Sequence, residues 1–247
     1  MIIILLYTIL LLLIYVTYLI FYWNWDKSCQ PYYNNNEPLL IGHRGSPTDI
    51  TENTIPSFEK AISQGVDGLE FDVRLSRDNQ IVVFHDADLK RLSKRSEKIE
   101  TLSLAKLQTV ELNKQQGQKE DVYIPSLNEL VSLLARVKMV NIEIKSDSIF
   151  HGHGIIKPLI KFLNMYHLDD KCIVSSFNPL ILMRLKLKRP NTIIGLLYNR
   201  NRLFHGWNNM IWVLRVQPEN LHIHYSLLNS WVVKWARKKG MRINSYT

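Results

Sequence analysis

From residue 39 to the end of the chain, short apolar runs alternate with segments that have the periodicity of amphipathic helices. Apolar runs bounded by turn residues predict buried strands, and the helical patterns between them predict crossover connections. Such an alternation is typical of a parallel sheet covered by helices. A chain of 247 residues has room for a (β/α)8 barrel, which is the α/β fold class that the pattern predicts.

The strands and helices can be placed by residue number. We expect strands at 39–43, 68–75, 81–85, 140–144, 172–176, 193–197, 221–224 and 242–246. We expect helices after Asn53 or Thr54, after Ser126, over 154–166, after Asn178 and over 226–239. Residues 87–123 are rich in Lys, Glu, Gln and Ser and predict an irregular insertion with one short helix.

Without the short strand at 81–85, the run at 242–246 is the seventh strand of the barrel. The last helix and the eighth strand of a complete barrel are then missing. An open barrel exposes an unpaired strand edge beside the first strand. We therefore expect an incomplete barrel with reduced stability.

The N-terminus differs from everything that follows, because residues 2–22 contain no charged residue, proline or glycine. A helix of this length is about 32 Å long and can cross a bilayer core. Tyrosines and tryptophans, Trp25 among them, gather at its C-terminal end, as at a membrane interface. A cleavable signal peptide has a basic start and a small-residue cleavage site, which are not visible here. We expect a single-pass membrane anchor over 1–25 and a polar linker over 26–38; the side faced by the domain is left open.

Composition narrows the possible partners. The net charge of +9 fits an anionic small-molecule substrate, a phospholipid surface or a nucleic acid. No stripe of interleaved basic and aromatic residues is visible, so we do not expect a nucleic-acid partner. Cys29 and Cys172 could pair, but two cysteines make no disulfide framework, so apolar packing must hold the core. The oligomeric state is left open.

Two acidic residues share one face of the predicted strand at 68–75. Side chains alternate along a strand, so Glu70, Asp72 and Arg74 lie opposite the apolar set. Two neighbouring buried carboxylates are costly unless a cation neutralises them. That cation is a metal ion or, alternatively, the guanidinium of Arg74 or Arg44.

The predicted strand at 140–144 repeats this arrangement. Asn141, Glu143 and Lys145 share one face, opposite two isoleucines. Three carboxylates with water and substrate oxygens suit one divalent cation, Mg²⁺ or Ca²⁺. The thiolate or multi-histidine cluster that zinc prefers is not visible.

Two histidines, His43 and His85, each close a predicted strand near these acids. Hydrolysis of a phosphodiester needs one group that accepts a proton from the nucleophile and another that protonates the leaving alkoxide. Two imidazoles can divide that work, since their pKa lies near neutrality. The planar fork of Arg44 suits two phosphate oxygens.

Taken in order along the chain, these motifs resemble the glycerophosphodiester phosphodiesterase family. The matching segments are His43-Arg44-Gly45, Glu52-Asn53-Thr54, 70–73, 75–78, His85-Asp86, 124–127, 141–145, 175–177 and 195–197. The resemblance covers 39–247 and implies a (β/α)8 barrel of the phospholipase C-like phosphodiesterase type. It also implies metal-dependent hydrolysis of glycerophosphodiesters to an alcohol and glycerol 3-phosphate, by way of a cyclic phosphate.

Residue by residue, the resemblance implies a complete active site. His43 and His85 match the family's acid/base pair, while Glu70, Asp72 and Glu143 match its metal ligands. Arg44 and Lys145 match its phosphate-contacting residues. Glu52 matches an acid that we interpret as orienting Arg44 or His43, or equally as a negative charge near a helix N-terminus.

Several alternatives stay open. The anchor favours a lysophospholipase D acting on lysophospholipids, a positive charge alone suggests a nuclease, and the short C-terminus suggests an inactive binding module. His151 and His153 are expected in a loop rather than at a metal. His222 and His224 alternate on one predicted strand, so both side chains face the same way and either line a pocket or pack in the core. Trp207 and Trp212, with Arg200 and Arg202 nearby, could lie on a membrane.

Overall fold

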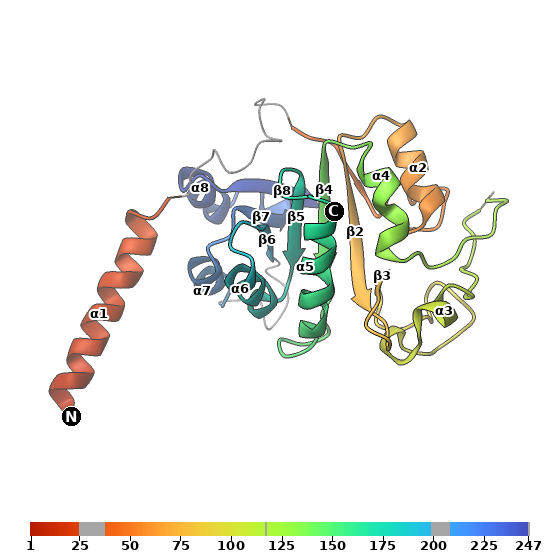
Figure 1. Cartoon of the computed structure of the whole chain (residues 1–247). Helices are drawn as coiled ribbons and strands as arrows, with labels where there is room; N and C mark the ends of the chain where they lie inside the picture. The colour runs from red at the N-terminus through yellow and green to blue at the C-terminus, as the bar shows by residue number, and fades with distance from the viewer. Residues whose placement is uncertain (25–37, 117, 199–207, 247) are drawn as a thin grey trace. The chain divides into compact units, whose positions relative to one another are not determined.

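The computed structural model describes residues 1–24, 38–116, 118–198 and 208–246 (Figure 1). The chain divides into two compact units, each described here by itself. The larger unit is Gln30–Ile194, and the smaller unit combines Met1–Cys29 with Gly195–Thr247. The predicted linker lies outside the described residues except for Pro38, as do Trp25, Cys29, Arg200, Arg202 and Trp207. The thiol of Cys172 is free and buried.

The larger unit is built on parallel strands in the order β1-β2-β4-β5. Their bounds are β1 Ile41–His43, β2 Gly68–Leu75, β4 Met139–Ile144 and β5 Cys172–Ser176. A short strand, β3 (Ile81–Val83), pairs antiparallel with the end of β2. The strand at 81–85 is thus shorter than predicted, and the prediction that His85 closes it is wrong. The N–H of Phe84 still donates to the Asp72 carbonyl of β2, and the chain leaves the strand after this hydrogen bond.

Helices connect these strands much as the sequence predicts. They are α2 Ile55–Ser63, α3 Leu104–Leu107, α4 Val131–Leu134, α5 Ile156–Met165 and α6 Pro179–Lys188. Thr54 caps α2 by accepting a hydrogen bond from the Ser57 N–H, and Asn178 caps α6 in the same way. The predicted capping box of Ser126 and Glu129 is present, although the turn it opens is a 3-10 helix that leads into α4.

The predicted insertion at 87–123 is largely irregular, but its apolar residues form a buried cluster together with residues that flank it in the chain. Its buried members are Val82, Phe84, Leu89, Leu92, Ile99, Leu107, Val110, Leu112, Val122 and Ile124. The apolar residues are spread thinly among charged ones, so the composition conceals the cluster. The insertion is therefore a packed layer over β3.

The register of the parallel strands creates layers inside the larger unit. An apolar cluster formed by Met139, Ile173 and Ile193, with Leu39 and Ile41 packed against it, lies toward the beginning of the strands. Further along, Glu70 is level with Asn141, and Asp72 is level with Glu143 and Ser175. Acidic side chains thus replace apolar ones toward the carboxyl ends, where (β/α) proteins place their active sites.

The helices of the smaller unit are α1 (Ile2–Phe21), α7 (Asn208–Val216) and α8 (Trp231–Lys238). Its strands are β7 (Asn220–His224), β8 (Arg242–Tyr246) and the part of β6 (Ile193–Tyr198) that begins at Gly195. β7 pairs in parallel with β6 and with β8. β8 corresponds to the strand counted as seventh in the sequence. Helix α7 is not predicted from the sequence. The predicted helix start at 226 is wrong, because α8 begins at Trp231, where Ser230 caps it.

Helix α1 has a mean hydropathy of 2.7, and only 6% of its most apolar window is buried. Its 20 residues are long and apolar enough to cross a membrane. A membrane anchor and a signal sequence both have these properties.

The two histidines of β7 have structural partners. His222 is buried, and its Nε2 lies 2.8 Å from Nδ2 of Asn244, which donates the hydrogen bond. The ring packs so closely on Gly195 that a Cβ at that position would collide with it. His224 instead accepts a hydrogen bond from the Ser226 N–H. The packing interpretation of His222 is thus confirmed.

Acid is expected to destabilise the protein through His222. Burial lowers the pKa of His222 to about 3, whereas an imidazole in the unfolded chain titrates near 6.5. Below that value the unfolded chain binds a proton that the folded chain does not, so the contribution to stability is lost as pH falls from about 6.5 toward 3. Between about pH 7.5 and about pH 5, in EDTA, the midpoint of thermal unfolding should fall further in wild type than in His222→Gln. Equal decreases in the two proteins would contradict this.

Candidate active site

Three carboxylates meet near the carboxyl ends of β2 and β4. Glu70 and Asp72 come from β2, and Glu143 comes from β4, level with Asp72. One ligand oxygen from each lies within 4.8 Å of the others, and all three residues are at most 6% exposed. Within the described ranges, no other group of acidic, histidine or cysteine residues comes together in a way that could hold a metal ion.

Two cations lie against this cluster. Asp72 is 3.1 Å from Nε of Arg44 and 2.9 Å from Nζ of Lys145, which also lies 2.5 Å from Glu143. The sequence analysis gave an ion pair with Arg44 as an alternative to a metal ion, and Asp72 forms that ion pair. Arg74, the other candidate, instead forms a two-pronged ion pair with Asp147.

The backbone of the first loop brings Arg44 into position. Arg44 has a φ of +57°, and its N–H donates to Oε2 of Glu70 at 3.0 Å. Gly45 follows with a φ of +88°, and a Cβ there would collide with Ser57 of α2. The Arg44-Gly45 pair is thus required by a tight turn between β1 and α2.

The cluster has the donor set and the unmet charge that a hard divalent cation needs. Oε1 of Glu70 is buried and has no hydrogen-bond partner. Burial and the charges of Asp72 and Glu143 raise the pKa of Glu70 well above its ordinary value. The pKa of Asp72 is lowered instead, because Lys145 and Arg44 outweigh the effect of burial. Three buried oxygen ligands with one carboxylate left uncompensated fit a cation such as Mg²⁺ or Ca²⁺.

Both histidines lie beside these acids. His43 is at the end of β1, half exposed, with Nε2 at 3.9 Å from Oε2 of Glu70. His85 lies just beyond β3, with Nδ1 at 2.6 Å from Oδ1 of Asp86. Burial lowers the pKa of both rings, and in both the Asp72 charge opposes that change. The charge of Asp72 thus acts on two histidines that are 42 positions apart in the chain.

A chain of ion pairs joins the two histidine loops, and the sequence analysis missed part of it. Glu52 lies 2.8 Å from Nη1 of Arg44, in keeping with its predicted contact with that residue. Arg91, from the insertion, lies 2.7 Å from Glu52 and 2.6 Å from Asp86. The position of Asp86 directly after His85 could have indicated its contact with that ring. Nothing in the sequence indicates the contacts of Arg91, since it is one of many cations in a polar segment.

If His85 is an acid or base, as the resemblance implies, Asp86→Asn should lower kcat about 10- to 100-fold, because the contact of Asp86 with Nδ1 would hold the tautomer and orientation of His85. The hydrogen bond that the Asp86 carboxylate accepts from Nδ1 raises the pKa of His85 against the larger effect of burial. Its loss should move the limb of the pH–rate profile that belongs to His85 to lower pH. Arg91→Gln, which leaves Asp86 in place, should move that limb to higher pH. A uniform loss of rate without either shift would contradict this positioning role.

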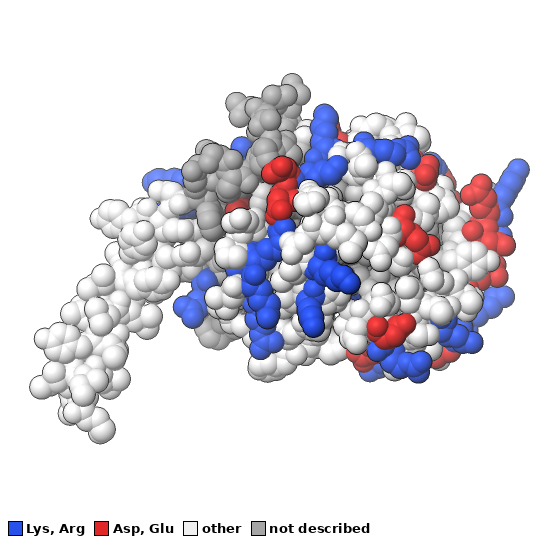
Figure 2. Space-filling view, in the orientation of Figure 1, with Lys and Arg blue, Asp and Glu red and all other residues white. Residues whose placement is uncertain are grey.

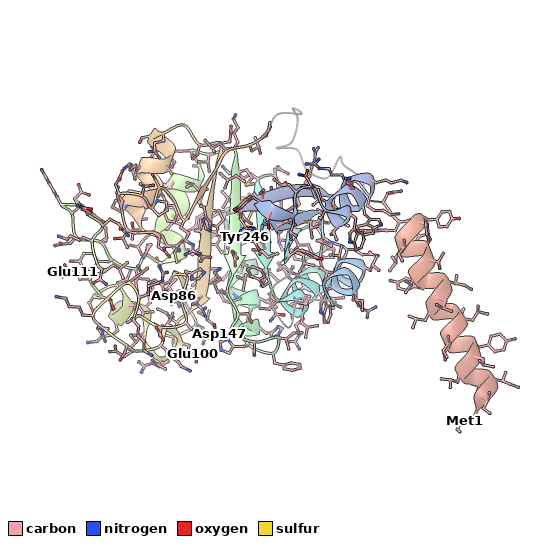
Figure 3. The ribbon with its side chains drawn as sticks, turned by 180° about the vertical axis from the view of Figure 1, so that it is seen from behind. Met1, Asp86, Glu100, Glu111, Asp147 and Tyr246 are labelled. Carbon is pink, nitrogen blue, oxygen red and sulfur yellow. The ribbon has the colours of Figure 1, made fainter. Side chains whose placement is uncertain are left out.

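A second set of contacts supports His85 from the other side. Nε of Arg74 donates to the His85 carbonyl at 2.9 Å, and Arg74 is held by Asp147, which follows β4. Asp86 and Asp147 lie toward the same end of the strands (Figure 3). Both flanks of the His85 loop are therefore fixed by ion pairs.

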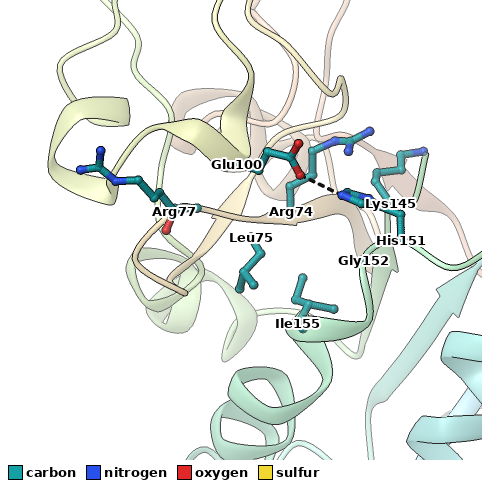
Figure 4. Close-up of a pocket in the computed structure, with 10 residues that line it drawn as sticks. Arg74, Leu75, Arg77, Glu100, Lys145, His151, Gly152 and Ile155 are labelled. Atoms are coloured by element: carbon teal, nitrogen blue, oxygen red, sulfur yellow. Dashed lines mark hydrogen bonds and ion pairs between the residues drawn. The ribbon is translucent and has the colours of Figure 1, made fainter. Parts of the chain in front are cut away.

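A pocket of about 220 Å³ borders Lys145. Leu75 and Ile155 form apolar walls, and the ion pair between Glu100 and His151, 2.8 Å long, crosses its rim (Figure 4). His153 contacts the Ile149 carbonyl at 3.0 Å. The loop interpretation of His151 and His153 is thus in agreement with the structure, and the insertion helps to shape the surroundings of the site.

Residues 43–247 match the model of the glycerophosphoryl diester phosphodiesterase family, which is most of the chain. The chain belongs to that family. A glycerophosphodiester phosphodiesterase of Caldanaerobacter subterraneus subsp. tengcongensis is 33% identical over 211 residues, which are 85% of each chain. Membership makes this protein a phosphoric diester hydrolase, as the resemblance of its motifs implied.

Solved structures of family members show the same fold. A glycerophosphodiester phosphodiesterase of Thermotoga maritima aligns with a TM-score of 0.64 at 29% identity, over 86% of this chain and 87% of that one. A phosphodiesterase of Oleispira antarctica, in complex with the product sn-glycerol-3-phosphate, aligns with a TM-score of 0.72 at 27% identity, over 85% and 84%. The protein thus has the parallel-stranded, TIM-like α/β fold of the family.

Proposed function

We propose that this protein hydrolyses glycerophosphodiesters to an alcohol and sn-glycerol 3-phosphate with His43 and His85 as acid and base. The observation that carries the proposal is the convergence of two imidazoles and two cations on one buried cluster of three carboxylates. Family membership and the product bound by the Oleispira antarctica relative support the choice of substrate.

Each residue has a distinct task in this proposal. Arg44 and Lys145 bind the phosphate oxygens, and Glu52 orients Arg44 through the contact at 2.8 Å. One imidazole accepts the proton of the glycerol hydroxyl next to the phosphate as that oxygen attacks phosphorus. The other gives a proton to the leaving alkoxide, and the cyclic phosphate is then opened by water with the same two groups in reversed roles.

Glu70, Asp72 and Glu143 would hold one divalent cation. When bound, the cation neutralises the charge that builds on the phosphoryl oxygens. Asp72 also contacts Arg44 and Lys145, so the proposed metal ligands and the proposed phosphate-binding side chains share one carboxylate.

For the whole chain we propose a single-pass membrane anchor at 1–25, a linker at 26–38 and a catalytic domain at 39–247 with an insertion at 87–123. The exposed, apolar surface of α1 supports the anchor. An anchor of this kind would bring the site close to lipids. It also favours a second candidate function, lysophospholipase D activity on lysophospholipids.

The test is the release of glycerol 3-phosphate by the purified full chain. Glycerophosphocholine and lysophosphatidylcholine serve as substrates, each with added Mg²⁺ or Ca²⁺. We expect glycerol 3-phosphate from the first substrate; choline from the second alone would favour the lysophospholipase D. No product from either substrate with either cation would refute the proposal.

A further inference from the structure

Most of the net positive charge of this chain belongs to the smaller unit. That unit has nine lysines and arginines against two acidic residues, Asp26 and Glu219, whereas Gln30–Ile194 has 22 against 20. All six tryptophans of the chain also fall in the smaller unit. Tryptophan together with an excess of Lys and Arg is the composition found where proteins meet a membrane surface.

The structure separates a buried from an exposed side of α8. Val232, Val233 and Ala236 are buried, and Trp231 on the other side is 65% exposed. Lys234, Arg237 and Lys238 are exposed as well. We call Trp231, Lys234, Arg237 and Lys238 the α8 face. Glu219, the one acidic residue in the described part of this unit, is buried, so the described surface of this unit exposes no acidic side chain beside the α8 face.

The α8 face is close to the end of the apolar helix. Nε1 of Trp235 in α8 donates to the carbonyl of Ile20 in α1 at 3.4 Å, and Leu19 is only 3% exposed. Residues 2–18 of α1 have no charged side chain and are exposed except for the half-buried Val16, and Lys and Arg side chains lie at α8 (Figure 2). An uncharged, lipid-compatible helix thus leads directly to a basic, tryptophan-bearing surface.

We propose that the α8 face binds the surface of a bilayer that contains anionic lipids. Trp231 would enter the headgroup region, and Lys234, Arg237 and Lys238 would pair with lipid phosphates. A nucleic acid would also attract these cations, but it offers no environment for α1. The inference goes beyond the hydrolytic reaction, because it concerns none of the proposed site residues.

The experiment uses the full chain in lipid nanodiscs, with Cys29→Ser to remove one thiol and an environment-sensitive bimane dye on Lys234→Cys. The same dye on Lys157→Cys, exposed on α5 of the other unit, is the matched control. We expect a blue shift of the dye at 234 in discs with about 30% phosphatidylglycerol relative to pure phosphatidylcholine, reversed by about 0.5 M NaCl. The dye at 157 should not respond.

Removing charge provides the second measurement. Arg237→Gln and Lys238→Gln should each lower the ratio of docked to undocked protein about fivefold. Hydrolysis of soluble glycerophosphocholine by both variants should stay unchanged, which separates this inference from the proposed function. The same emission at 234 in both lipid compositions, an equal shift at 157, or a shift produced by a single-stranded oligonucleotide in detergent would overturn the proposal.

Discussion

Replacing His43 by alanine is expected to lower kcat for glycerophosphodiester hydrolysis by about 10²- to 10⁴-fold, the range for loss of a general acid or base. The side chain of His43 is 46% exposed and packs little, so the fold should survive. Burial, with the nearby charge of Arg44, lowers the pKa of His43, so the ring is largely neutral at pH 7 and can accept a proton. The measurement is kcat and KM together with the thermal midpoint.

Two controls test whether the loss of activity is specific to the imidazole of His43. His167→Asn changes another exposed histidine, at a φ of +50° that asparagine tolerates, and should leave kcat unchanged. Free imidazole should partly restore His43→Ala, because the half-exposed position is open to a small base. A kcat within tenfold of wild type, with the fold intact, would remove His43 from the reaction.

Chelation of divalent cations with EDTA is expected to reduce the activity of wild-type protein to background, and Mg²⁺ or Ca²⁺ should restore it. The physical reason is that the three buried carboxylates are the proposed ligands of the cation that neutralises charge on the phosphoryl oxygens. Burial and the charges of Asp72 and Glu143 raise the pKa of Glu70, so a cation that binds there competes with a proton. Calorimetric titration in two buffers with different ionisation enthalpies should therefore detect proton release on binding.

Glu70 also makes the stability of the metal-free protein depend on pH. The pKa of Glu70 is higher in the folded than in the unfolded state, where it is about 4.3. The folded protein then holds the extra proton, so the contribution of Glu70 to stability is fully present below about pH 4.3 and is lost as pH rises through the folded pKa. A bound cation should abolish this decrease.

Glu70→Gln is the sharpest variant for this prediction. It removes a repelling charge and keeps the shape, so in EDTA at about pH 8 its thermal midpoint should exceed that of wild type. It should also lose most of the rise in midpoint on adding cation and most of the activity. A wild-type protein that stays fully active in EDTA, or a Glu70→Gln variant that binds cations as wild type does, would contradict the proposed metal site.

Local patterns in the sequence determined much of the framework. Alternation along 68–75 and 141–145 predicted which acids share a face, and the structure brings Glu70, Asp72 and Glu143 within 4.8 Å. Caps at Thr54 and Asn178 fixed the helix starts. These features depend on neighbours within a few residues, so the sequence displays them directly.

Tertiary structure alone decided how the charges are shared. Asp72 pairs with Arg44 and Lys145 while Arg74 turns to Asp147, and a strand pattern cannot distinguish these two arginines. Arg91 reaches Glu52 across 39 positions from a segment that looks like a solvated insertion. Such pairings depend on strand register and on the packing of distant loops, which bring together groups whose local sequence carries no record of each other.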